Sequence, residues 1–363
     1  MKDEAEVVLK LSDLDISFRS PRGLIHAIRG VDITLRRGET VALVGESGSG
    51  KSVTMRAVMG ILPDNAVVNS GEIFYTLETK DGSREAVNLL KSKATWREEH
   101  INGSHIAMVF QDPMTSLNPT MRIGSQLIGA IRSHERISRT EAYARSLKLL
   151  TEVGITAPEE RMEQFPHQLS GGMRQRVVIA IALSCNPDIL ICDEPTTALD
   201  VTVQEKILRM INRIQAQRQL SVVFITHNMG VVARVADYVN VMYAGKVVES
   251  GTIVDIFYDP RHPYTWGLLS SIPEVESVGT DLYSIPGTPP DLRKEIRGDA
   301  FAPRNRYAME IDYKAQPPMF RISDTHYAAT WLLDERAPKV ERPPELEQRI
   351  RRLKEEAKQY AAG

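Results

Sequence analysis

Two early stretches of the chain, residues 7–18 and 25–35, alternate between apolar and polar positions, which is typical of antiparallel strands with one buried face. The next apolar run, residues 39–44, is continuous and leads directly into a glycine-rich turn. A continuous run of this kind predicts a strand that is buried on both faces, as in a parallel sheet. We expect a helix to begin after the turn, at Lys51.

The middle of the chain changes to the spacing of helices. Apolar residues recur at helical intervals through much of residues 121–184, which predicts a helical subdomain set within a sheet domain. Apolar runs predict further strands at 105–110, 188–193 and 221–226, and hairpins at 71–78 with 85–90 and at 238–250, the latter turning at Ala244 and Gly245. Because strands alternate with helices, the pattern indicates an α/β fold with a mostly parallel sheet and an antiparallel edge sheet.

The chain changes character beyond Pro260. Prolines become frequent and the periodicity weakens, which predicts a small, loop-rich appendage, followed by a charged helix from about Glu345 to Tyr360. We find no internal repeat. The predicted division is a domain at 1–260 with its helical subdomain at about 112–185, an extension at 261–340, and a charged helical tail at 341–363.

Composition narrows the classes of function. The 363 residues are 42% hydrophobic, enough for a substantial core, and the formal net charge of −2 argues against a polynucleotide partner. Cys185 and Cys192 lie in apolar runs, so we expect buried thiols in a reducing cytosol and no disulfide. Residues 1–15 lack the features of a secretory leader, and no run of about 18 apolar residues predicts a membrane-spanning helix.

Residues 45–52 read GESGSGKS, a G-x4-G-K-S loop placed between the expected strand and helix. Such a loop turns backbone N–H groups toward phosphates, and the helix N-terminus adds positive potential. Lys51 is expected to reach the terminal phosphates, and Ser52 to offer its hydroxyl to Mg²⁺. The expected nucleotide contacts are Gly45, Ser47, Gly48, Ser49, Gly50, Lys51, Ser52 and Val53. A tight turn without a ligand is disfavoured by the flanking strand and helix, but the loop alone indicates only a nucleotide.

A second apolar strand, at 189–193, ends in two acidic residues. Asp193 is placed to hold the Mg²⁺ ion, and Glu194 to orient and polarise the water that attacks the γ-phosphate. An acidic pair at a strand end is by itself equally typical of a solvated turn. The phosphate loop in the same chain makes the catalytic interpretation the better one.

Residues 169–173 read LSGGM and come immediately before an expected helix. Ser170 and the N–H groups of Gly171 and Gly172 would form a second anion-binding helix start, and an N-cap serine followed by flexible glycines is the structural alternative. With this segment placed between the phosphate loop and the acidic strand, residues 7–260 resemble the ABC ATPase family. The resemblance implies that the LSGG segment contacts the γ-phosphate bound by a partner cassette.

Single residues match the same family at isolated positions. Phe18 stands where the family stacks an aromatic ring on adenine, and Gln111 where a glutamine senses Mg²⁺ and the attacking water. Asp200 matches an aspartate loop that crosses the dimer, and His227 a histidine that contacts the γ-phosphate. Core packing, solvation or capping would explain each residue taken individually.

The resemblance implies a pair of cassettes that close head to tail over two molecules of ATP with Mg²⁺. Water oriented by Glu194 and His227 would attack in line, and release of the phosphate would separate the cassettes. The implied partners are a second ABC ATPase subunit and two transmembrane permease subunits. The implied location is the cytoplasmic face of the cell membrane.

Three stretches, at 111–119, 262–269 and 286–290, resemble the oligopeptide and dipeptide importer branch of the family. This resemblance extends to about residue 333. It implies a C-terminal extension, a second ATPase subunit that is a different chain, and an extracytoplasmic peptide-binding protein that delivers the cargo.

Many members of this branch carry four extension cysteines that bind an iron–sulfur cluster, the first two in a pattern like GCxFxxRC. The corresponding residues here are Asp299, Asn305, Asp312 and Thr330. Because such a cluster needs cysteine ligands, we predict none. Packing of apolar residues is expected to maintain the extension instead, by Phe301, Tyr307, Met309, Phe320, Tyr327 and Trp331.

Two other functions stay open on the sequence alone. One is the ATPase subunit of a related importer, for nickel or another solute, because nickel importers share the signatures of the branch. An ABC ATPase that acts on nucleic acid or ribosomes would normally show two cassettes, a long coiled coil or basic patches, and the sequence shows none of these. The basic start of the run RIRRLKEEAKQY is better explained as a solvated helix face.

Overall fold

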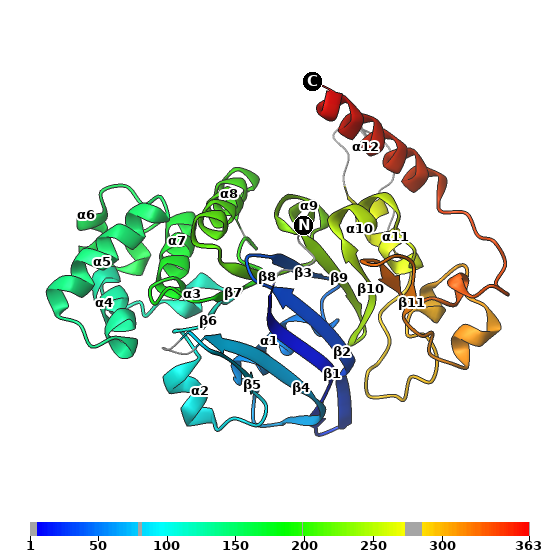
Figure 1. The fold of residues 1–363 in the computed structure, drawn as a ribbon, viewed down its shortest axis with the longest axis horizontal. Helices are drawn as coiled ribbons and strands as arrows, with labels where there is room; N and C mark the ends of the chain where they lie inside the picture. The colour runs from blue at the N-terminus through cyan, green and yellow to red at the C-terminus, as the bar shows by residue number, and fades with distance from the viewer. Residues whose placement is uncertain (1–5, 79–81, 198, 273–284, 363) are drawn as a thin grey trace.

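The computed structural model of the chain describes residues 6–78, 82–197, 199–272 and 285–362. Four of its first five strands form an antiparallel sheet in the order β2-β1-β4-β5 (Figure 1). The strands are β1 (Val7–Ser20), β2 (Gly23–Arg36), β4 (Ala66–Glu78) and β5 (Arg84–Asn88). The predicted hairpin between β4 and β5 is present, although its turn lies partly outside the described residues.

An eight-stranded sheet has the order β11-β12-β10-β9-β3-β8-β7-β6. Its strands are β3 (Thr40–Val44), β6 (Ile106–Val109), β7 (Ile189–Asp193), β8 (Ser221–Thr226), β9 (Tyr238–Tyr243), β10 (Lys246–Thr252), β11 (Phe320–Arg321) and β12 (Tyr327–Ala328). The strands from β9 to β6 are parallel, whereas β10, β12 and β11 add antiparallel pairs at one edge. The two sheets confirm the predicted α/β fold with an antiparallel companion sheet.

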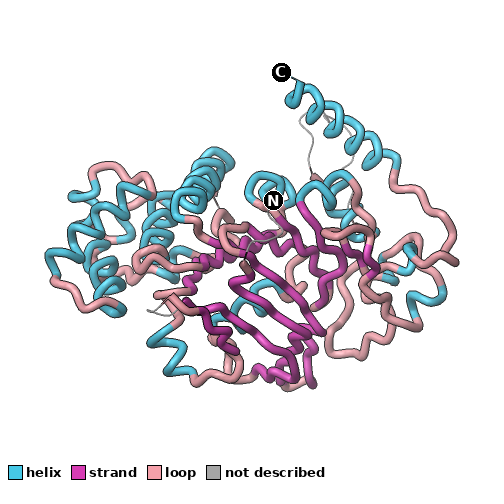
Figure 2. Tube along the Cα trace, in the orientation of Figure 1, coloured by secondary structure: helices cyan, strands magenta, loops and turns pink. Residues whose placement is uncertain are grey.

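Helices connect the parallel strands and cover them (Figure 2). The helix predicted at Lys51 begins there, as α1 (Lys51–Met59). Between β5 and β7 the chain forms α2 (Ala94–His100), α3 (Pro113–Ser116), α4 (Ile123–His134), α5 (Arg139–Glu152), α6 (Pro158–Glu163) and α7 (Gly171–Ala182). The later helices are α8 (Val201–Arg218), α9 (Met229–Val235), α10 (Ile253–Tyr258), α11 (Pro263–Ser270) and α12 (Pro344–Ala362). Among the described residues, no helix is both long and apolar enough to cross a bilayer.

Alternation along the buried strands sends their side chains to opposite faces of the sheet. In β3, Val41 and Leu43 pack toward the antiparallel sheet and α1, whereas Ala42 and Val44 pack toward α10 and α11. A separate cluster fills the space between β7, β8 and helices α4, α5, α7 and α8. We call the cluster on the α10 and α11 side the C-terminal core; it includes Ala42, Val44, Val239, Val241, Tyr264, Trp266, Phe301, Leu346 and Ile350.

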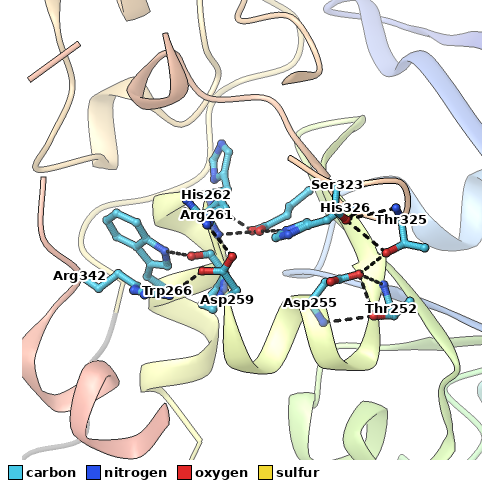
Figure 3. Close-up of polar contacts among 12 residues, drawn as sticks. Thr252, Asp255, Asp259, Arg261, His262, Trp266, Ser323, Thr325, His326 and Arg342 are labelled. Atoms are coloured by element: carbon cyan, nitrogen blue, oxygen red, sulfur yellow. Dashed lines mark hydrogen bonds and ion pairs between the residues drawn. The ribbon is translucent and has the colours of Figure 1, made fainter. Parts of the chain in front are cut away.

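Buried polar contacts fasten the extension to β10 and α10 (Figure 3). The Glu249 carboxylate, which is 0% exposed, accepts hydrogen bonds from Arg261 N–H at 2.6 Å and from His326 Nε2 at 2.8 Å. Asp255 Oδ2 accepts a hydrogen bond from Thr325 Oγ1 at 2.8 Å. Because a buried carboxylate is costly without such partners, the contacts of Glu249 hold the extension against the sheet, and the half-buried contact of Asp255 with Thr325 adds a second attachment.

Candidate active site

The predicted site residues lie at the carboxyl ends of neighbouring parallel strands. The phosphate loop follows β3, Gln111 follows β6, Asp193 ends β7, and His227 follows β8. Since β3, β8, β7 and β6 are consecutive in the sheet, these ends share one edge. The carboxyl edge of an open α/β sheet is where such folds bind ligands.

The phosphate loop requires glycine at its first position. Gly45 has a φ of 155°, and a Cβ atom there would lie 2.1 Å from the carbonyl oxygen of Met242 in β9. Lys51 is buried, and its Nζ donates to the carbonyl oxygens of Gly45 at 2.8 Å and Glu46 at 2.9 Å. Burial lowers the pKa of Lys51, although the nearby carboxylates, Glu194 first, act in the opposite direction. The loop therefore holds the ammonium group of Lys51 within a compact turn.

Two oxygen ligands for a cation meet beside the loop. Ser52 Oγ donates to Asp193 Oδ1 at 2.7 Å. Asp193 is 2% exposed, and this burial raises its pKa against the opposing effect of the Ser52 hydrogen bond. Because Mg²⁺ in nucleotide sites takes one or two carboxylates, hydroxyls and phosphate oxygens, this pair of side chains fits that ion.

Glu194 is the centre of a hydrogen-bonded group. Its Oε2 atom accepts from Gln111 Nε2 at 3.1 Å and from Thr197 Oγ1 at 2.9 Å, while Oε1 lies 3.0 Å from His227 Nδ1. Burial alone would raise the pKa of Glu194, but the hydrogen bonds from His227 and Thr197 outweigh it and hold that pKa below its ordinary value. The side chain is therefore a fixed carboxylate at neutral pH, suited to accept a proton or orient water.

The backbone at Glu194 is strained. Its φ is 47°, in the left-handed region that a residue with a side chain rarely adopts. Such a conformation costs on the order of 1 kcal/mol and persists where the surroundings fix it, often at functional sites. With this backbone conformation, the Glu194 carboxylate lies within hydrogen-bond distance of Gln111 and His227.

The residues expected to serve a partner cassette lie in a separate group. Ser170 Oγ caps α7 by accepting from Met173 N–H at 3.3 Å, and Asp200 Oδ1 caps α8 by accepting from Val203 N–H at 2.9 Å. A Cβ atom on Gly172 would lie 2.6 Å from Val203 Cγ1, so the LSGG segment and the start of α8 are in close contact. Gly171 lies in the same turn of α7.

Phe18 and Val53 are half-buried beside the hydrophobic cluster between the two sheets. Phe18 does not end its strand as predicted, because pairing continues to Ser20, which lies opposite Gly23 in the hairpin. Contact of Phe18 with adenine and of Val53 with the nucleotide stays a prediction.

The positions that correspond to cysteines in the family pattern have local roles here. Each side chain accepts a hydrogen bond from a nearby backbone N–H group, and each residue is buried. The acceptors are Asp299 for Phe301, Asn305 for Tyr307, Asp312 for Met309 and Thr330 for Leu332. These oxygen-bearing turns do not provide the thiolates that an iron–sulfur cluster requires.

Sequence reasoning missed several residues of the site. Thr197 holds the Glu194 carboxylate, and its position three residues later in the same turn was the available signal. Glu46, in the phosphate loop, is bound by Arg304 and Tyr264 of the extension. Nothing local in the sequence links residues this far apart.

Comparison with known proteins agrees with the geometry. Residues 28–197 match the ABC transporter family, and residues 248–311 match the family described as oligopeptide/dipeptide transporter, C-terminal region. The chain is 53% identical to the oligopeptide transport ATP-binding protein OppD of Bacillus subtilis (strain 168), over 95% of this chain and 94% of that protein. It is 51% identical to the dipeptide transport ATP-binding protein DppD of Lactococcus lactis subsp. cremoris (strain MG1363), over 92% of this chain and 93% of that protein.

Solved structures show the same fold. The structure resembles the dimeric post-hydrolysis state of the ATP-binding cassette MJ0796 bound to ADP and Pi, with a TM-score of 0.58 and 25% identity. The match covers 68% of this chain and 98% of that chain. Fold and motifs together define the class of protein, an ATP-binding cassette ATPase. More particularly, the chain belongs to the family of ABC transporter ATP-binding proteins that carry the oligopeptide/dipeptide type of C-terminal region.

Proposed function

We propose that this chain hydrolyses ATP to drive the import of oligopeptides or dipeptides. The observation that carries hydrolysis is the Glu194 carboxylate, which Gln111, Thr197 and His227 hold beside the phosphate loop. The relatives named above, which match over most of their length, are transport ATP-binding proteins for oligopeptides and dipeptides, and this supports the cargo.

The side chains divide the chemistry among them. The N–H groups of the phosphate loop and Lys51 bind the phosphates, and Phe18 stacks on the adenine. Ser52, Asp193 and Gln111 would hold Mg²⁺, which would supply charge neutralisation for the phosphate oxygens. Glu194 positions the attacking water and accepts its proton, and His227 orients Glu194 through the 3.0 Å contact.

The chain works as one half of a pair of cassettes. Ser170, Gly171, Gly172 and Asp200 complete the site of the other cassette, which is a different chain. Val201, next to Asp200, is 80% exposed, which suits a surface that a second subunit covers. Two permease subunits and an extracytoplasmic peptide-binding protein complete the importer. The chain binds the permeases at the cytoplasmic face of the membrane. The chain has no nucleic-acid partner.

The extension functions without an iron–sulfur cluster. The residues at the cysteine positions are oxygen acceptors for local N–H groups, which supports this proposal. Elemental analysis of protein purified without oxygen should find no stoichiometric iron. One cluster's worth of iron per chain would contradict the proposal.

Two experiments test the function. Affinity purification of the chain from solubilised membranes should recover two permeases and a second ATPase; ribosomes or DNA in their place would refute a role in transport. Deletion of the gene should abolish growth on defined oligopeptides or dipeptides as the nitrogen source, and the wild-type gene should restore it. Loss of nickel uptake with peptide growth unchanged would instead assign the chain to a nickel importer.

A further inference from the structure

Two residues of the C-terminal extension contact one residue of the phosphate loop. Arg304 binds the Glu46 carboxylate with both ends of its guanidinium group, through Nη1 to Oε2 at 2.7 Å and Nη2 to Oε1 at 3.0 Å. The hydroxyl of Tyr264, in α11, accepts a hydrogen bond from the backbone N–H of Glu46 at 2.7 Å. The extension therefore holds both the side chain and the backbone of this loop residue.

Every N–H group of the Arg304 guanidinium donates a hydrogen bond, and these bonds fix its position. Nε donates to the Pro286 carbonyl oxygen at 2.8 Å, Nη2 also donates to the Ile285 carbonyl oxygen at 3.3 Å, and Nη1 to the Tyr243 hydroxyl at 3.2 Å. With the two bonds to Glu46, all five N–H groups of the arginine are used. The side chain is 5% exposed, so it is rigid rather than a mobile surface arginine.

Tyr264 is equally constrained. It is 0% exposed, and its ring lies 4.7 Å from the ring of Tyr243 and 5.3 Å from the ring of Phe301, measured between centroids. The position of its hydroxyl is therefore set by the C-terminal core. A rigid acceptor at the backbone of Glu46 limits the conformations open to the phosphate loop.

Arg304 also has an electrostatic effect on the loop, because it pairs with the negative charge of Glu46. Glu46 is the second residue of the phosphate loop, and Lys51 Nζ donates to its backbone carbonyl oxygen at 2.9 Å, so the Glu46 carboxylate adds negative charge to the loop that meets the phosphates. An unpaired carboxylate there would repel a polyphosphate anion. The bidentate contact with Arg304 neutralises that charge and aligns the loop.

We propose that the C-terminal extension positions the phosphate loop, with Arg304 and Tyr264 as positioning residues that hold Glu46 and thereby raise the affinity of the cassette for ATP. The proposal gives a role to two of the stretches characteristic of the importer branch, because residues 262–269 supply Tyr264 and residues 286–290 supply a carbonyl anchor for Arg304. It rests on the proposed function of the loop as the ATP site.

Binding of a fluorescent ATP analogue with Mg²⁺ to the full chain tests the charge effect. Arg304→Gln should weaken the affinity by about tenfold, because it leaves the Glu46 carboxylate unpaired in the phosphate loop. Adding Glu46→Gln to Arg304→Gln should return the affinity to within about threefold of wild type, since the repulsive charge is then gone. The matched control is Arg336→Gln, which removes an 86% exposed extension arginine that binds both carboxylate oxygens of Asp334 through Nε and Nη2, and should leave affinity unchanged.

A merely structural role would lower the melting temperature without this pattern of loss and rescue. Equal affinity for Arg304→Gln and Arg336→Gln, or failure of Glu46→Gln to restore binding, would overturn the proposal. Should Arg304→Gln not fold, Tyr264→Phe decides, because it removes only the acceptor of the Glu46 N–H and should weaken binding by about threefold; wild-type affinity would again overturn the proposal.

A further variant separates this inference from the proposed function. Lys51→Ala should strongly weaken binding of the analogue if the loop is the ATP site. Weakened binding in Lys51→Ala with normal binding in Arg304→Gln and Tyr264→Phe would refute only the role of the extension. Unchanged binding in Lys51→Ala would refute the site itself.

Discussion

Replacing Glu194 with glutamine should stop hydrolysis while leaving ATP binding intact. Oε2 of Glu194 accepts from Gln111 and Thr197, so the amide oxygen of a glutamine can occupy that position and keep both hydrogen bonds. The amide NH₂ group would then face His227 Nδ1, which can accept from it when the imidazole carries its proton on Nε2. The local structure is therefore preserved, and the lost property is the basicity of the carboxylate.

The size of the effect follows from that single loss. A positioned general base contributes a factor of about 10² to 10⁴ to a rate. Glu194→Gln should therefore lower the rate of ATP hydrolysis by at least about 100-fold, equivalent to about 2.7 kcal/mol in the activation barrier. The retained hydrogen bonds predict that the affinity for ATP and the melting temperature change little.

The assay is phosphate release by the assembled transporter, with ATP binding measured in parallel on the same preparation. Glu310→Gln, the same change at a side chain of the extension that is 83% exposed, serves as the control and should hydrolyse ATP at the wild-type rate. Hydrolysis by Glu194→Gln within threefold of wild type, with binding intact, would refute the assignment of the base. Loss of ATP binding itself would refute the argument that the amide preserves the local structure.

Three further changes test other parts of the structure. Thr197→Val removes one hydrogen bond that keeps the pKa of Glu194 low, so that pKa should rise and the acidic limb of the pH–rate profile of hydrolysis should move to higher pH; an unmoved limb would contradict this. Gly172→Ala should destabilise the fold in denaturant titrations, because the new Cβ atom would lie 2.6 Å from a side chain of α8. Gly129→Ala, in α4, should instead stabilise the fold by up to about 1 kcal/mol, because a Cβ atom there has no neighbour within 4 Å. Equal effects of the two alanines would contradict the close contact of α7 with α8. Burial raises the pKa of Asp299 to about 6 in the folded chain. The free energy of unfolding should therefore be greatest at pH values below the pKa of this aspartate in the unfolded chain, and should fall as the pH rises through 6. Asp299→Asn should remove that fall and stabilise the chain at pH 8 by up to about 3 kcal/mol, with no difference near pH 4.

The sequence could point to candidate site residues because each lies at or just after a strand end that the local apolar pattern reveals. Parallel strands bring their carboxyl ends to one edge, where Gln111 and His227 contact Glu194 and Asp193 contacts Ser52, while the catalytic roles of these residues stay predictions. The order of those strands was not readable from the sequence, because hydrophobic periodicity identifies strands and not their neighbours. The left-handed backbone of Glu194 was equally hidden, as a glutamate gives no local signal for a positive φ.

Other features of the structure are absent from the sequence-based prediction for different reasons. Helix α8 has a clear local signal, because Ile207, Leu208, Ile211 and Ile214 are buried at helical spacing. The stretch at 262–269 was recognised only as a family signature, although His262 caps the helix that it contains. The pair of Arg304 with Glu46 joins residues separated by 258 positions, and such a contact depends on tertiary packing that no local pattern encodes.

The C-terminal core has a consequence for how the chain unfolds. One face of β3 and β9 is covered by Tyr264 and Trp266, and the same cluster includes Phe301 of the extension and Leu346 of α12. Cassette and extension therefore share one interior, and neither can melt while the other keeps its buried surface. Calorimetry should record a single cooperative transition for the whole chain, and a chain truncated after Pro260 would expose an apolar sheet face and aggregate rather than serve as a minimal cassette.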